Sequence, residues 1–141
     1  MQTHAAVMAQ RGGRWSIDSI DVADPGPGEV RVRVVASGIC QTDVHARDGF
    51  FARMPWPAVF GHEGAGVVES VGPGVTTLAP HDHVIMAAPS CGQCDDCLSG
   101  FESYCSDVNR LKHTGGRMHG RQDFSRHGEP GAGSRCQHSA L

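Results

Sequence analysis

The sequence has no long apolar run, no excess of positive charge and no recognisable leader. A membrane-crossing helix needs about 20 consecutive apolar residues, and no such span occurs. Residues 1–10 lack the basic stretch and the apolar run of a secretory signal, so we expect a cytoplasmic protein. Twelve Lys and Arg against 15 Asp and Glu give a net charge of −3, which offers no basic field to nucleic acid or an anionic membrane. A small molecule is therefore the expected partner.

The composition changes near residue 110. Residues 1–110 carry 7 Lys and Arg against 13 Asp and Glu, whereas residues 111–141 carry 5 against 2 and four of the nine His. The last stretch also has no Val, Ile, Trp or Tyr, so it can bury little apolar area to offset its ordering entropy. This pattern predicts one folded domain over 1–110 and a poorly ordered Gly/His/Arg-rich tail over 111–141.

Short strand patterns separated by turn signals run through the predicted domain. Apolar and charged residues alternate strictly over 29–34, and weaker strand patterns cover 5–8, 15–22, 64–71 and 82–88. Several strands between Pro and Gly turns, with one short helix, predict a mostly β barrel or sandwich.

Glycines mark a turn and a helix end within this pattern. Gly12-Gly13 indicates a hairpin between the first two strands. A helix of one or two turns is predicted over 42–48, capped by Thr42 or Asp43 and ended by Gly49.

Gly64 and Gly66 could instead belong to a dinucleotide-binding loop. The third glycine of Gly-x-Gly-x-x-Gly would then fall on Glu69, and β-branched residues follow where a helix should begin. A strand explains the same residues without a ligand, and the complete motif occurs nowhere else in the sequence. No cofactor-binding residues are therefore predicted.

Four cysteines fall within fifteen residues as Cys-x2-Cys-x2-Cys-x7-Cys; they are Cys91, Cys94, Cys97 and Cys105. Spacings of two let neighbouring sulfurs converge on one cation, and four thiolates fill the tetrahedral shell of Zn²⁺. Because a closed shell leaves no position for substrate, we predict a structural zinc site.

Two other interpretations of these cysteines were weighed against zinc. Sulfurs two residues apart pair poorly as disulfides, and a chain without a secretion signal is expected in a reducing compartment. A bacterial ferredoxin cluster places its fourth cysteine after three residues and before proline, whereas here it follows after seven and precedes Ser106. Spacing and ligand type favour zinc.

A second group of potential ligands comes from two separate stretches. Cys40 and Asp43 lie where a predicted strand passes into the predicted helix, and His62 and Glu63 follow about twenty residues later. Each stretch alone is a weak signal of a functional site, because a lone Cys is usually a buried small hydrophobe and a lone His is usually structural. Together a thiolate and an imidazole are ligands that zinc takes at catalytic centres, with carboxylates available behind them.

Four stretches of sequence form a recognisable set: residues 37–45 (SGICQTDVH), 60–68 (FGHEGAGVV), 80–84 (PHDHV) and 91–105 with its four cysteines. This set resembles the N-terminal, chaperonin-10 (GroES)-like catalytic domain of zinc-dependent medium-chain alcohol dehydrogenases, and the resemblance covers residues 5–108. It implies a partly open β-barrel with short helices and a four-cysteine zinc lobe at 91–105. It also places His81 where the family usually has glycine, which is expected to strain that turn.

Carried over by position, the resemblance implies that Cys40 and His62 are ligands of a catalytic zinc. Glu63 would lie beside the metal as an alternative ligand or a charge that tunes it, and Asp43 would orient His62 through its other ring nitrogen.

The resemblance also implies a route for the alcohol proton. Thr42 would accept a hydrogen bond from the alcohol, and His45 would pass the proton towards solvent. Without the resemblance, a helix cap for Thr42 and a solvent-facing position for His45 would be the favoured interpretations.

Members of this family continue into a Rossmann domain that binds NAD(P), and they take a third catalytic-zinc ligand, usually Cys, from further along the chain. Neither is recognised here, and Cys136 lies outside the family's motifs. The first hypothesis is therefore an oxidoreductase acting on alcohols, present only as a truncated or frameshifted catalytic domain and inactive alone. Family members are often homo-oligomers.

The second hypothesis is a non-catalytic zinc-binding remnant that keeps only the four-cysteine site. A zinc-free relative of the quinone-reductase type is disfavoured, because it would explain neither Cys40 with His62 nor the four cysteines.

Overall fold

The computed structural model describes residues 1–52, 54–113, 134–135 and 139–140. Its strands form two sheets, with the order β2-β1-β4-β7 in one and β3-β5-β6-β8 in the other. The strands are β1 (Gln2–Met8), β2 (Trp15–Asp21), β3 (Val30–Ser37), β4 (Ala58–Val59), β5 (Gly64–Val71), β6 (His83–Ala87), β7 (Ser134–Arg135) and β8 (Ser139–Ala140). The helices are α1 (Gln41–Arg47), α2 (Asp95–Leu98), α3 (Val108–His113) and the 3-10 turn η1 (Glu102–Tyr104). The prediction of a mostly β fold with short helices is confirmed.

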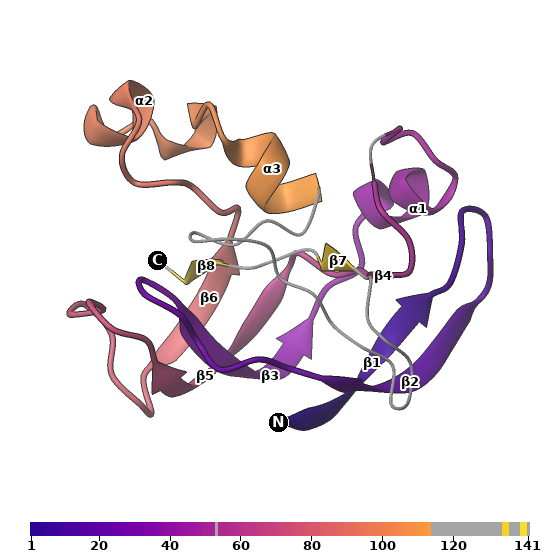
Figure 1. The fold of residues 1–141 in the computed structure, drawn as a ribbon, viewed down its shortest axis with the longest axis horizontal. Helices are drawn as coiled ribbons and strands as arrows, with labels where there is room; N and C mark the ends of the chain where they lie inside the picture. Colours follow the sequence, from indigo (N-terminus) through magenta and orange to yellow (C-terminus); the bar gives the residue numbers. More distant parts are fainter. Residues whose placement is uncertain (53, 114–133, 136–138, 141) are drawn as a thin grey trace.

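Helices lie on one side of the strands at two separate places (Figure 1). One helical segment, α2 with η1 and α3, lies beyond the end of β6, and the other is α1, above β4. The four-cysteine segment and the helix that follows β3 thus both lie on this side of the strands.

The first sheet is built on a hairpin. β1 and β2 pair antiparallel from Gln2↔Asp21 to Met8↔Trp15, and Gly12 in the connecting turn has φ 67°. This is the hairpin predicted from the two adjacent glycines, because a positive φ is accessible to glycine without steric penalty. Buried Val7 and Ile20 join its two strands.

The second sheet depends on a close approach of β3 and β5. They pair antiparallel from Val30↔Val71 to Ser37↔Gly64, with two register shifts along the way. A Cβ placed on Gly66 would lie 2.3 Å from the carbonyl oxygen of Arg33, so only glycine lets the two backbones come this close. The glycines of this stretch therefore serve strand pairing, as the strand interpretation predicted.

Helix α1 begins one or two residues earlier than predicted. Its N-cap is Cys40, whose sulfur accepts the N–H of Thr42 at 3.5 Å, and the Asp43 carboxylate in turn accepts the N–H of Cys40 at 3.1 Å. The predicted cap at Thr42 or Asp43 is therefore wrong, because the sulfur of Cys40 takes the place of the usual hydroxyl in a capping box. Gly49 ends the helix with φ 87°, as predicted.

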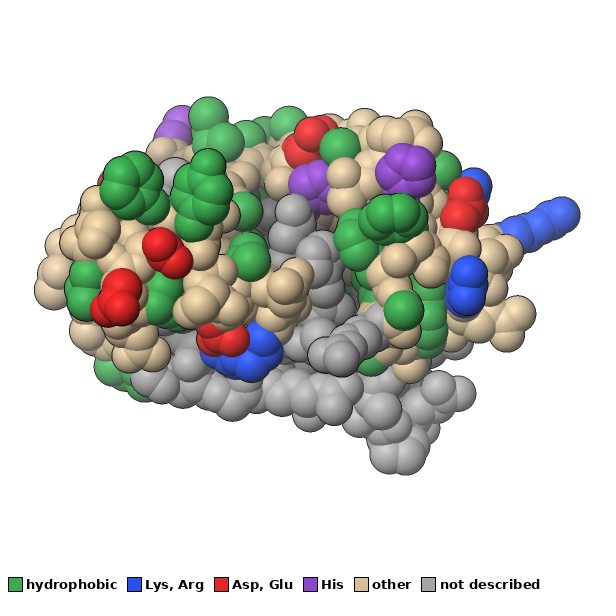
Figure 2. Space-filling model, turned by 90° about the horizontal axis from the view of Figure 1, so that it is seen from above, with side chains coloured by type: hydrophobic (Ala, Val, Ile, Leu, Met, Phe, Trp, Pro, Cys, Tyr) green, Lys and Arg blue, Asp and Glu red, His purple; other side chains and the backbone are tan. Residues whose placement is uncertain are grey.

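In the described part of the chain, some of the buried residues group into three small clusters. One joins β1, β2 and β4, and a second joins α1 to the segment around Met54 and Ala58. In the third, the buried residues are three cysteines and Leu111. Three large apolar side chains of that third region, those of Leu98, Phe101 and Tyr104, are exposed, and Figure 2 shows hydrophobic side chains together with acidic ones over this end of the molecule.

The turn before β6 contains the strain expected from the sequence. His81 is the one described non-glycine residue with positive φ, at 79°. Its N–H donates to the carbonyl of Val68 at 2.9 Å, and Asp82 closes the turn by accepting the N–H of Ala79 at 2.8 Å. These bonds hold His81 in the left-handed conformation, which is unfavourable for a residue with a Cβ.

The predicted boundary at residue 110 falls inside a helix, since α3 spans Val108–His113. Most of the predicted tail, including Cys136, lies outside the described residues, and its poor order stays a prediction. Among the described residues, no helix has both the length and the apolar character needed to cross a bilayer.

Candidate metal centres

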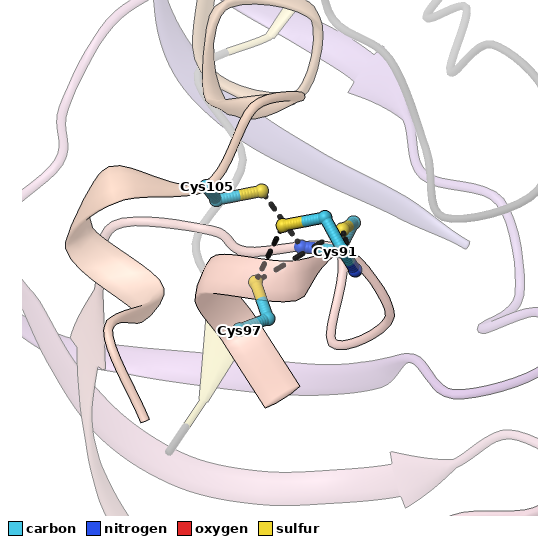
Figure 3. Close-up of side chains that lie close together, drawn as sticks. Cys91, Cys97 and Cys105 are labelled. Atoms are coloured by element: carbon cyan, nitrogen blue, oxygen red, sulfur yellow. Dashed lines mark hydrogen bonds between the residues drawn. The ribbon is translucent and has the colours of Figure 1, made fainter. Parts of the chain in front are cut away.

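The four predicted zinc ligands come together in one lobe of the structure. Cys91 lies in the loop that follows β6, Cys94 caps α2, Cys97 lies within α2, and Cys105 follows η1. The side chains of Cys91, Cys97 and Cys105 point towards one another from these three segments (Figure 3). With the sulfur of Cys94 included, the four sulfur atoms all lie within 4.8 Å of one another.

The distances between these sulfurs fit a tetrahedral zinc shell. Zn–S bonds of about 2.3 Å in a tetrahedron place neighbouring sulfurs about 3.8 Å apart. The sulfur of Cys94 lies 3.4 Å from that of Cys97, which in turn lies 4.0 Å from that of Cys91. All five described cysteines are free, so these contacts are not disulfides. The four donors could hold one metal ion with no position left over.

Backbone N–H groups point at the sulfurs. The N–H of Cys91 donates to the sulfur of Cys105 at 3.3 Å, and the N–H of Cys94 donates to the sulfur of Cys91 at 3.4 Å. Hydrogen bonds from the backbone of Cys97 and Ser106 lower the pKa of the Cys94 thiol to about 6. Burial, followed by hydrogen bonding with Cys94, raises the pKa of Cys97 to about 12. The N–H groups favour thiolates, which are the metal-binding form.

The second group of candidate ligands is assembled by the pairing of β3 with β5. Ser37 pairs with Gly64 at the end of the two strands, so Cys40 and His62 extend from the same end of the sheet. The N–H of Gly38 donates to the carbonyl of Glu63 at 2.8 Å and continues the pairing past the last strand residues. Ligand atoms of Cys40, His62 and Glu63 all lie within 4.8 Å of one another.

Asp43 connects the two halves of this group. Its Oδ1 lies 3.1 Å from Nδ1 of His62, and its Oδ2 accepts the N–H of Cys40 at 3.1 Å. It is also the one buried charged residue in the described part of the chain. A buried carboxylate needs such partners, and its contact with Nδ1 leaves Nε2 of His62 for a metal.

This second group differs from the cysteine lobe in being open. A thiol, an imidazole and a carboxylate are three donors of the types that zinc binds, and a tetrahedral ion would have a fourth position free. Cys40 and His62 are partly buried and Glu63 is exposed, so solvent reaches this group of donors.

Thr42 and His45 lie on α1 beside this group. The hydroxyl of Thr42 lies 3.4 Å from the sulfur of Cys40. His45 follows one helical turn later, on the same face of the helix, and its exposed ring tilts against Phe50 at a centroid distance of 5.8 Å. Along this face of α1, the half-buried hydroxyl of Thr42 is thus followed by the exposed imidazole of His45.

The role of Cys40 as the N-cap of α1 was not predicted from the sequence. The signal was present as Cys40-x-x-Asp43, which is a capping-box spacing with sulfur in place of a hydroxyl. The cap fixes the position of Cys40 relative to Asp43, so one local structure sets both a candidate ligand and its supporting carboxylate.

Known proteins share this domain. The sequence pattern described as "Alcohol dehydrogenase GroES-like domain" matches residues 26–134. The chain belongs to this family of alcohol dehydrogenase domains. The resemblance inferred from the four stretches of sequence is thereby confirmed.

Relatives of this alcohol dehydrogenase domain include one curated protein and two crystal structures. Alcohol dehydrogenase B of Mycobacterium tuberculosis is 41% identical over 106 residues, which is 74% of this chain and 28% of that protein. An alcohol dehydrogenase zinc-binding domain protein from Burkholderia ambifaria has a TM-score of 0.86 and 42% identity over 94% of this chain and 36% of its own. Benzyl alcohol dehydrogenase from Acinetobacter calcoaceticus has a TM-score of 0.82 and 36% identity over 88% of this chain and 34% of its own. The chain thus spans about a third of the length of these relatives.

Proposed function

We propose that the chain is the metal-binding catalytic domain of a zinc-dependent alcohol dehydrogenase, which interconverts an alcohol and an aldehyde or ketone with NAD(P). The observation that carries the proposal is the convergence of Cys40, His62 and Glu63 at one end of β3 and β5. Three donors leave one position for a substrate oxygen, whereas the cysteine lobe, which would hold a structural zinc, leaves none.

In this proposal Cys40 and His62 hold the catalytic zinc, and Glu63 is a third donor or a charge that tunes the metal. A zinc ion there would act as a Lewis acid and lower the pKa of a bound hydroxyl group. Asp43 keeps the His62 ring in place through Nδ1 and stabilises the tautomer that presents Nε2 to a metal.

Thr42 and His45 carry the alcohol proton away. The Thr42 hydroxyl lies 3.4 Å from the Cys40 sulfur, which supports a role in accepting a hydrogen bond from an alcohol beside that ligand. His45 is exposed one turn further along α1, and in this proposal its imidazole passes the proton to solvent. Bridging water between the two side chains would complete the path.

Hydride transfer needs a nicotinamide, and these 141 residues contain no Gly-x-Gly-x-x-Gly motif. We therefore propose that the chain by itself binds no NAD(P) and catalyses no alcohol oxidation. Reduction of NAD⁺ or NADP⁺ by the purified 141-residue chain, with primary, secondary or benzylic alcohols, would contradict this part of the proposal.

A second candidate function is a zinc-binding module without catalysis. It is favoured by the contrast between four closely spaced cysteines in the lobe and only three donors, one of them exposed, at the second group. The five cysteines in the described part of the chain are free thiols, which suits a reducing compartment, and for either function we propose the cytoplasm.

Cobalt substitution separates the two candidates. Co²⁺ takes tetrahedral sites like those of zinc and reports its ligands through visible absorption. With the lobe filled by zinc and Co²⁺ added to the second site, an alcohol or aldehyde should change the cobalt spectrum, and a Cys40→Ser variant should show no such signal. A cobalt spectrum that ignores the added ligand would favour the non-catalytic module.

A further inference from the structure

We propose that Gly38 is a positioning residue for the second metal site, because its missing side chain leaves the space in which the Glu63 carboxylate lies beside Cys40 and His62. The inference rests on the proposed function, since it assigns a role towards the metal that this site would hold. Gly38 directly follows the last residue of β3, and this position alone suggests no role at the metal site.

The space around Gly38 is filled by one side chain. A Cβ placed on Gly38 would lie 2.3 Å from Oε2 of Glu63, 3.1 Å from its Cβ and 3.3 Å from its Cδ. These are the three nearest heavy atoms, so the glutamate side chain as a whole packs over the bare Cα. The first distance is far below van der Waals contact, and the carboxylate would have to move if any side chain were present.

The backbone itself does not require glycine at this position. Gly38 is absent from the described glycines with positive φ, in contrast to Gly49 and Gly61. An alanine could therefore adopt the same φ without left-handed strain. What an alanine would meet at this position is the Glu63 side chain.

The two residues cannot separate easily. The N–H of Gly38 donates to the carbonyl of Glu63 at 2.8 Å, directly beyond the Ser37↔Gly64 pair. Moving the backbones apart would break this hydrogen bond, so an added methyl group is accommodated by turning the Glu63 side chain away. The carboxylate then leaves the Cys40 and His62 ligand atoms, and the site loses its third donor.

The experiment is a double-mutant cycle on Co²⁺ affinity, using the full chain with its lobe filled by zinc. The variants are Gly38→Ala, Glu63→Ala and the double variant, with Cys40→Ser run alongside to report any cobalt that enters the lobe. Gly38→Ala should weaken Co²⁺ binding roughly 10-fold or more and alter the cobalt absorption as Glu63→Ala does. In the Glu63→Ala background, Gly38→Ala should have no further effect.

A compensating change adds a second readout. In Gly38→Ala/Glu63→Asp the carboxylate is held on a shorter stem, so Co²⁺ affinity should recover towards that of Glu63→Asp alone. If Gly38→Ala alone fails to fold, the double variant with Glu63→Ala should fold, because the closest contact, with the carboxylate, is then absent and only the Cβ of residue 63 remains near the added methyl group.

Failure of this inference can be distinguished from failure of the proposed function. Cobalt that binds the wild-type second site while Gly38→Ala leaves affinity and spectrum unchanged would overturn this inference alone. Equal losses from Gly38→Ala with and without Glu63 would also overturn it, by showing that the effect does not pass through Glu63. A wild-type chain that binds no Co²⁺ outside the lobe would overturn the proposed function and this inference with it.

Discussion

The carboxylate of Asp43 lies 3.1 Å from Nδ1 of His62, although the two residues are nineteen positions apart in the chain. The same carboxylate accepts the N–H of Cys40. One buried acidic group thus holds both proposed ligands of the second metal site, one through its ring and the other through its backbone.

Replacing Asp43 with Asn should therefore weaken metal binding at the second site. The amide is neutral and holds the imidazole less strongly, so we expect a roughly 10- to 100-fold loss of Co²⁺ affinity there, measured by titration with the lobe filled by zinc. Asp48→Asn is the matched control, because Asp48 is an exposed residue at the end of the same helix that pairs with Arg47. Equal affinities for Asp43→Asn and Asp48→Asn would exclude the proposed role of Asp43.

Removing metal from the cysteine lobe should disorder α2 and α3. The buried residues of this cluster are Leu111 and three cysteines, which supply little apolar area without a metal to hold them. Chelation should expose residues 91–113 to limited proteolysis while the β1–β2 hairpin stays protected. Cys97→Ser should show the same cleavage without chelator, and Cys40→Ser should not. Resistance of the chelated lobe to protease would contradict a structural role for metal.

In the metal-free chain, the thiol of Cys94 should react faster than that of Cys97. Backbone hydrogen bonds lower its pKa to about 6, so it is largely thiolate at pH 7, whereas burial keeps Cys97 protonated. Alkylation at Cys94, followed by peptide mass spectrometry, should rise steeply through pH 6 and level off by about pH 7–8. Zinc should suppress it, and denaturant should abolish the preference for Cys94. Faster alkylation at Cys97 than at Cys94 would contradict the assignment.

Replacing His81 with Gly should stabilise the protein. The residue has φ 79°, and a side chain in this conformation costs about 1 kcal/mol relative to glycine. Urea denaturation should show an increase of that size in the free energy of unfolding. His83→Gly is the control; His83 lies in β6, where glycine weakens a strand, and this variant should be destabilised. A destabilised His81→Gly variant would mean that the His81 side chain makes a compensating contact.

Much of the fold could be predicted because its signals are local. The bounds of β5 were predicted from the run of small and β-branched residues over 64–71, and the hairpin from its two glycines. β4, β7 and β8 have two residues each, which is too short for any alternation of apolar and polar residues to be recognised.

The cysteine lobe was predictable for the same reason, since its four ligands fall within fifteen residues. The second site was not predictable from its residues alone. Cys40 and His62 meet because of the register of β3 on β5, and the nearest local signal was the Cys40-x-x-Asp43 spacing. Resemblance to a family supplied the connection that the pattern lacked.

The role of Gly38 could not be inferred from the sequence. Glycine at the end of a strand usually indicates a turn, and here the decisive feature is a side chain twenty-five residues away that occupies the space of its missing Cβ. Such a constraint exists only after β3 and β5 have paired.

The number of zinc ions per chain tests the central claim most directly. Elemental analysis of the wild-type chain, purified under reducing conditions and given excess zinc before desalting, should find two zinc ions. Cys40→Ser should retain one, held by the lobe, and Cys97→Ser should lose the lobe's ion. A single zinc in the wild-type chain, unchanged by Cys40→Ser, would contradict the account and leave the four-cysteine lobe as the protein's one metal site.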